Sequence, residues 1–235
     1  MRFFLIITFI LCSTFNFAFP RDEGVEVMFS VPVGGGYSSH NVNFVSNANL
    51  DFFFTYNKNK INKAGFETGL EFLVGYLLPF ENFDMIFLGN IGYSYDYFGL
   101  NILEVDEDYY FHSVKIGFDS KFLVSNFSIG LATGVKIPFG LTFITYSSHK
   151  NEDINYFSDL DNKLKLRMMP YFQISLDYIF DFDYTSLLIG PYLTYEFGLL
   201  VKSDDIYIDT KELSSIDFGL KISILLSMNN FINRK

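Results

Sequence analysis

Five charged residues could interact in the interior of this protein, because each lies on the polar side of a segment whose other side is apolar: Glu71, Lys115, Lys136, Arg167 and Glu196. In a narrow protein interior such charges must pair or hydrogen-bond, since an isolated buried ion is very costly. The dipeptide at 125–126 predicts a two-residue turn, and that register sets Lys115 opposite Lys136. Like charges directly opposite each other are destabilising, so we expect a carboxylate to bridge them, with Glu71 as the candidate.

The connection at 181–183 likewise sets Arg167 opposite Glu196 or one position away. The five residues therefore predict an ion network. The polar faces carry seven acidic and five basic residues, which predicts a nearly balanced interior: Glu67, Glu71, Asp96, Asp119, Asp177, Glu196 and Asp217 against Lys115, Lys136, Lys165, Arg167 and Lys221. One interpretation is a small gated channel, and the other, which we favour, is a polar core that fills the interior and never conducts.

The sequence gives little support to catalysis. His40, His112 and His149 are scattered, with no metal-ligand spacing and no G-x-S-x-G nucleophile motif. His112 and Ser113 fall on opposite faces of one predicted strand, so they cannot act together as base and nucleophile. We therefore expect that the protein is not an enzyme and that it binds no metal and no cofactor.

A two-residue period runs through the segments that position these residues. In 164–180, for example, nearly every even-numbered residue is apolar and most odd-numbered ones are polar, which is typical of a strand with two different faces. Eight segments show this pattern: 42–56, 66–80, 85–98, 110–124, 127–145, 164–180, 184–201 and 215–228. They predict an all-β fold, an eight-stranded antiparallel up-and-down transmembrane β-barrel.

The connections alternate in length as well. Those at 81–84, 125–126 and 181–183 are short, while 57–65, 99–109, 146–162 and 202–213 are longer and polar. Short turns at one end and long loops at the other are typical of bacterial outer-membrane barrels. An even number of strands also leaves both chain ends on the side of the short turns.

The first strand has two candidates. Residues 25–36 alternate too, and a ninth strand would leave the chain ends on opposite sides of the membrane. Either 19–40 is a lead-in and the barrel occupies 41–235, or 25–36 is the true first strand and 42–56 belongs to the first loop. We favour 42–56, because its two faces separate more cleanly.

The apolar stripe could face lipid, or it could face the interior of a soluble, lipocalin-like carrier of apolar ligands. Its side chains are bulky, whereas the opposite face is rich in Gly, Ser, Ala and Thr. An eight-stranded interior is just wide enough for side chains to fill it. Bulky residues outside and small ones inside fit that interior, so we expect the stripe to contact membrane lipid.

The chain ends and the net charge limit the location and the partners. Residues 1–18 combine a basic start, an apolar run and a small residue at Ala18, as a secretory signal peptide does. The net charge of −10 argues against nucleic acid as a partner.

Acidic residues gather in the predicted long loops: Asp106, Glu107, Glu152, Asp153, Asp159, Asp204 and Asp205. They form either a solvated rim or a surface that docks host extracellular proteins.

These features resemble the small OmpA/OmpX-type outer-membrane barrels, and the composition resembles that of small outer-membrane proteins from spirochaetes such as Borrelia. The resemblance is architectural and covers most of the chain after the signal. It implies a monomer in the bacterial outer membrane, with surface-exposed loops. The terminal aromatic residue usual in the family is displaced here, since four residues follow Phe231.

Overall fold

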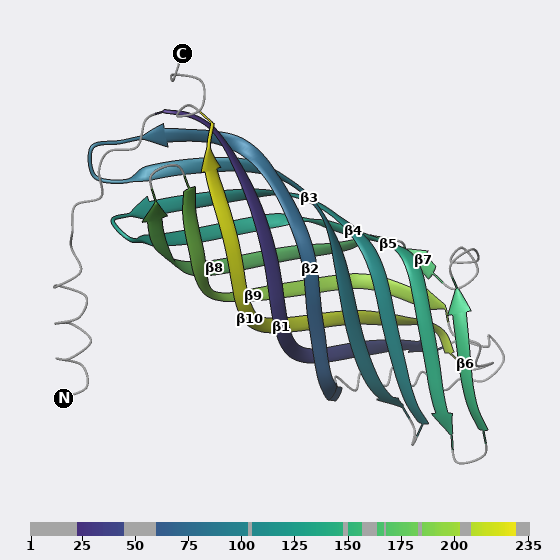
Figure 1. Cartoon of the computed structure of the whole chain (residues 1–235). Coiled ribbons are helices and arrows are strands. Elements are labelled where there is room, and N and C mark those ends of the chain that lie inside the picture. The colour runs from purple at the N-terminus through teal and green to yellow at the C-terminus, as the bar shows by residue number, and fades with distance from the viewer. Residues whose placement is uncertain are drawn as a thin grey trace, which may run out of the picture.

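The computed structural model describes residues 23–44, 60–102, 105–147, 150–156, 164–166, 168–182, 185–202 and 208–228. Within these ranges all regular structure is β-strand, and no helix is long and apolar enough to cross a membrane. Eight long strands pair into one antiparallel sheet that closes on itself (Figure 1): β1 (Gly24–Phe44), β2 (Lys60–Pro79), β3 (Asp84–Ile102), β4 (Val105–Val124), β5 (Phe127–Ser147), β8 (Met169–Phe182), β9 (Thr185–Lys202) and β10 (Ile208–Ser227). The predicted eight-stranded antiparallel barrel is confirmed.

Pairing of β1 with β10 closes the barrel. The register runs from Glu26 opposite Ser227 to Asn43 opposite Thr210, while the other edge of β1 pairs with β2. The preference for 42–56 as the first strand is therefore wrong, and 25–36 is no lead-in. The reason is that β1 pairs with a neighbouring strand on both sides over most of its length, which a comparison of isolated segments does not reveal. Residues 45–56, and the predicted signal peptide at 1–18, lie outside the described residues.

Two of the three short connections lie within one residue of their predicted positions, at 80–83 and 125–126, while residues 183–184, between β8 and β9, lie outside the described residues. Ser125 and Asn126 form a two-residue turn between paired Val124 and Phe127, with Ser125 in the left-handed region at φ 53°. At the other end of the barrel the strands continue into the predicted loops. β3 and β4 pair up to Ile102 opposite Val105, so most of the predicted loop 99–109 is strand. The short strand β6 (Lys150–Tyr156) extends the sheet beyond β5, and β7 (Leu164–Leu166) pairs with β9.

The two faces of the wall differ as the alternation predicts. Phe172 and Leu220 point outward and are 44% and 58% exposed, and Ile174 and Ile222 on the same faces of their strands are exposed as well. Exposed apolar side chains encircle the barrel on every long strand, and such a belt requires lipid around it. The soluble carrier with an apolar interior is thereby contradicted.

A bulge changes the outer face of β5. Gly140 pairs with His112 and Pro138 with Ser113, so Phe139 is the extra residue. Proline has no N–H for the ladder and is tolerated at such irregularities. Beyond the bulge the alternation shifts by one. Uninterrupted alternation over 127–145 would place Leu141 on the outward face with Ile129 and Leu131, but it is buried inside.

The interior has three layers, which differs from the expectation of only small and ionic residues. At the loop end lies an apolar layer: Phe98, Tyr109, Phe111, Leu141, Met169, Leu199 and Leu213. At the short-turn end lies a second: Met28, Leu73, Leu77, Ile86, Leu88, Leu123, Ile179, Leu188 and Leu225. Between them the interior is polar and charged. Large inward residues fit because glycine and serine occupy many neighbouring inward positions.

Candidate functional site in the barrel lumen

Lys136 of β5 is the centre of the charged layer on the loop side. Its Nζ lies 2.9 Å from Glu67 Oε1 of β2 and 2.7 Å from Asp96 Oδ1 of β3, and it also contacts Glu196 of β9. All four side chains are almost completely buried. Because β2, β5 and β9 are not neighbours in the wall, these ion pairs run across the lumen and connect opposite sides of the barrel.

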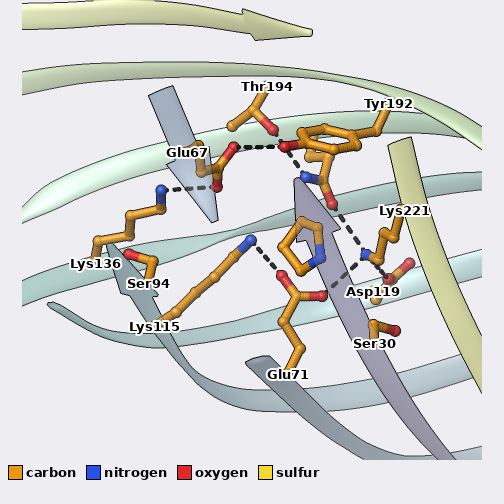
Figure 2. A network of polar contacts seen from close by, with 12 residues as sticks. Ser30, Glu67, Glu71, Ser94, Lys115, Asp119, Lys136, Tyr192, Thr194 and Lys221 are labelled. Carbon is orange, nitrogen blue, oxygen red and sulfur yellow. Dashed lines mark hydrogen bonds and ion pairs between the residues drawn. The ribbon is translucent and has the colours of Figure 1, made fainter. Parts of the chain in front are cut away.

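A second cluster lies beside the first (Figure 2). Lys115 Nζ of β4 donates to Glu71 Oε1 of β2 at 2.5 Å, and Lys221 Nζ of β10 lies 3.0 Å from Glu71 Oε2. Lys221 also lies 3.7 Å from Asp119 and donates to Gln173 at 3.1 Å. Glu71 therefore has a lysine at each oxygen, which compensates its buried charge.

A third pair lies towards the short turns. Lys121 Nζ donates to Asp177 Oδ2 at 2.7 Å, and both side chains are fully buried. Lys121 has the same inward parity as Lys115 and Asp119, so the sequence alternation could have identified it.

Two tyrosines fill the space between the clusters. The Tyr192 hydroxyl donates to Glu67 Oε2 at 3.2 Å, and Lys115 Nζ lies 4.3 Å from the centre of the Tyr171 ring. Both rings lie against glycines. A Cβ at Gly34 would meet the Tyr192 hydroxyl oxygen at 2.4 Å, and one at Gly117 would meet that of Tyr171 at 2.2 Å. Glycine is therefore required where these rings approach the wall.

The structure arranges the predicted network residues differently from the expectation. Lys115 and Lys136 are directly opposite, as the turn register predicted. Glu71 contacts Lys115 but does not bridge to Lys136, which instead contacts Glu196, Glu67 and Asp96. Arg167 lies outside the described residues, and Glu196 pairs with Tyr171 in the sheet. The tilt of the strands decides which residues meet across the lumen, and that tilt cannot be read from one hairpin.

Acidic residues outnumber basic ones among the buried charges of the described residues. Nine are acidic and four are lysines: Glu26, Glu67, Glu71, Asp96, Asp108, Asp119, Asp177, Glu196 and Asp217 against Lys115, Lys121, Lys136 and Lys221. The expected near-balance is therefore wrong for this part of the chain. The excess is largest near Lys136, the only lysine bonded to Glu67, Asp96 or Glu196 among the described ion pairs.

Three carboxylates at the Lys136 cluster lie close enough to hold a metal ion. Oxygens of Glu67, Asp96 and Glu196 are within 4.8 Å of one another. The Lys136 ammonium contacts all three and already supplies the cation that they need. The geometry therefore favours an internal ion cluster over a metal centre.

The predicted acidic loop residues are only partly covered by the structure. Asp106 and Glu107 belong to β4, and Glu152 and Asp153 belong to β6, so these four lie on strands and not in loops. Their strands continue past the expected boundaries because each finds a paired neighbour. Asp159, Asp204 and Asp205 lie outside the described residues.

No protein-family profile and no curated protein sequence matches the chain. Among solved structures, the chain is similar to Ail, the attachment invasion locus protein of Yersinia pestis, at 13% identity and a TM-score of 0.36, with 85% of this chain and 99% of that one covered. It is also similar to the outer membrane protease OmpT of Escherichia coli, at 8% identity and a TM-score of 0.48, with 91% and 99% covered. Neisserial surface protein A gives 8% identity and a TM-score of 0.37, with 86% and 99% covered. These values are too low to transfer a function, and none supports the resemblance to spirochaetal proteins.

Proposed function

We propose that this protein is an integral outer-membrane barrel with a closed lumen, which acts through the surface that it presents at the loop end. The observation that carries the proposal is the layered interior. An apolar layer lies at each end of the lumen, and the charged layer between them is cross-linked by ion pairs. Ions crossing such an interior would have to pass an apolar cluster at each end and the paired charges between them.

The same arrangement gives the barrel a structural role. Each ion pair across the lumen connects strands that the sheet does not place side by side, so the wall is fixed from inside. We infer no catalysis, because the four buried lysines are each paired with a carboxylate and no base and nucleophile meet among the described residues. The loop end then remains as the surface for recognition, and we favour a monomeric barrel that binds a host extracellular protein there.

Planar-bilayer conductance of the refolded protein tests the closed lumen. We expect no steady conductance from the unaltered chain, and none from Lys136→Ala, because the two apolar layers remain. A steady conductance that changes in Lys136→Ala would contradict the proposal.

That outcome would favour the second candidate, a small channel. If the lumen conducts, the excess of carboxylates over lysines inside it predicts that the channel selects cations over anions. Its reversal potential in a salt gradient would show the selectivity directly.

Docking at the loop end has its own test. Deletion of 147–161 should remove binding to an immobilised panel of matrix glycoproteins while the barrel still inserts. Binding that survives this deletion unchanged would count against recognition through this part of the loop end.

A further inference from the structure

A row of aromatic rings runs along the outer face of β3, β4 and β5. Neighbouring ring centroids along the row are 4.9–6.3 Å apart, from Phe139 through Tyr93, His112, Tyr95 and Tyr110 to Tyr97. We call these six residues the aromatic ladder. No other part of the described outer surface joins so many rings: on β9, for comparison, Tyr195 and Phe197 form a single stack.

The ladder begins where the lipid-facing belt ends and continues beyond it. A strand tilted by about 40° advances roughly 2.5 Å per residue along the membrane normal, so a belt about 25 Å tall takes about ten residues. Counted from Phe83 at the short turn, Tyr93 falls at the far edge of the belt on β3. Tyr95 and Tyr97 then lie about 5 and 10 Å further out, at the height of lipid headgroups.

The polar groups of the six ladder residues are hydroxyls and an imidazole. Tyr93 Oη and His112 Nδ1 share a hydrogen bond of 2.7 Å, and the Tyr97 hydroxyl donates to Asp108 Oδ1 at 3.0 Å. Among the outward side chains that the structure describes on these three strands beyond Tyr93, none is Lys or Arg. A phosphate headgroup would therefore find no fixed cation on these outward faces, which disfavours anionic lipid.

We propose that the aromatic ladder binds the sugar headgroup of a neutral glycolipid in the outer leaflet. A pyranose ring presents C–H groups on its faces, which stack on tyrosine rings, and hydroxyls at its edges, which match phenol and imidazole partners. The occupant follows from the height of the ladder, because what lies beside a barrel wall just above the acyl chains is a headgroup. This inference rests on the proposed outer-membrane location and goes beyond it by assigning a lipid class and a site.

The test is lipid retention by the full chain. The protein is reconstituted in phosphatidylcholine containing a minor fraction of monogalactosyl diacylglycerol, or of phosphatidylglycerol, and the lipids retained are measured by native mass spectrometry. We expect the galactolipid to be enriched about fivefold over its bulk fraction, the amount that one stack with the strength of an ordinary aromatic pair provides. Tyr95→Leu/Tyr110→Leu should remove the enrichment. The matched control, Tyr195→Leu/Phe197→Leu on β9, should leave it unchanged.

The outcomes are separable. Tyr95→Phe/Tyr110→Phe keeps the rings and should retain most of the enrichment, which excludes a general folding defect as the cause of loss. An inserted barrel that retains phosphatidylglycerol or phosphatidylcholine as strongly as the galactolipid overturns the ladder proposal alone. A chain that fails to insert, judged by its far-UV circular dichroism and its heat-dependent gel mobility, overturns the proposed function and the ladder with it.

Discussion

Replacing Lys136 with methionine tests the account of the lumen most directly. Methionine keeps the length and volume of the side chain but removes the one ammonium that contacts Glu67, Asp96 and Glu196. Removing one member of a buried ion pair typically costs about 3–5 kcal/mol, because the remaining charge is left uncompensated. Here three carboxylates lose their shared partner at once, so we expect a loss of unfolding free energy of about 5 kcal/mol, the upper end of that range.

Urea-induced unfolding from phospholipid vesicles, followed by far-UV circular dichroism, measures this loss. Lys121→Met is the matched control, because Lys121 is equally buried but bonds a single carboxylate, that of Asp177. We expect it to lose about 3 kcal/mol, the lower end of the same range. Combining Lys136→Met with Glu67→Gln, Asp96→Asn and Glu196→Gln should restore most of the stability, since it removes the charges together. A Lys136→Met barrel within about 1 kcal/mol of the unaltered one would refute the reasoning, as that is the value of an exposed pair.

Three further outcomes are expected. Leu220→Arg, near the middle of the outer belt, should lower the unfolding free energy by about 2–4 kcal/mol in vesicles, and Phe182→Arg at the short-turn edge by about 0–1 kcal/mol; equal losses would contradict the lipid belt. Gly34→Ala should lower the unfolding free energy by about 1–3 kcal/mol, because the added methyl group clashes with Tyr192. Tyr192→Phe should lower it less in the Gly34→Ala background than alone. Additive losses in this double-mutant cycle would count against the contact. Protease treatment of intact cells should cut the chain only at the long connections, and the masses of the fragments identify the cleavage sites. Cleavage near 125–126 would show that the barrel has the opposite orientation in the membrane.

Much of the wall could be predicted from the sequence, because its determinants are local. Alternation of side chains specifies the strands, and the turn at 125–126 sets Lys115 opposite Lys136 without any knowledge of the remaining fold. The same local information misassigned Leu141, since the bulge at Phe139 depends on the pairing of Pro138 with Ser113. It also misjudged β1, whose identity as a strand depends on β10, almost two hundred residues away.

The site was less predictable, because contacts across a lumen depend on the geometry of the whole barrel. Alternation shows that Glu67, Glu71 and Asp96 point inward, but it does not show which lysine each one meets. Strand tilt and register around the closed sheet bring Lys136 to Glu67 and Lys115 to Glu71. The apolar layers were missed for a related reason: inward leucines such as Leu77 and Leu188 interrupt small-residue stretches on several strands, and only closure gathers them into one layer.

The interior and the outer surface place different demands on this chain. Rearranging a lumen whose ion pairs connect β5 with β2 and β9 costs much free energy, because any movement that separates one pair leaves a buried charge uncompensated. Gating through such a lumen would require several lysines to exchange partners together while two apolar layers open. The outer surface has no such requirement: the binding proposed for the aromatic ladder and the loop end needs no change in these ion pairs. The physical cost of altering the interior is therefore the strongest reason to look for the activity of this protein on its surface.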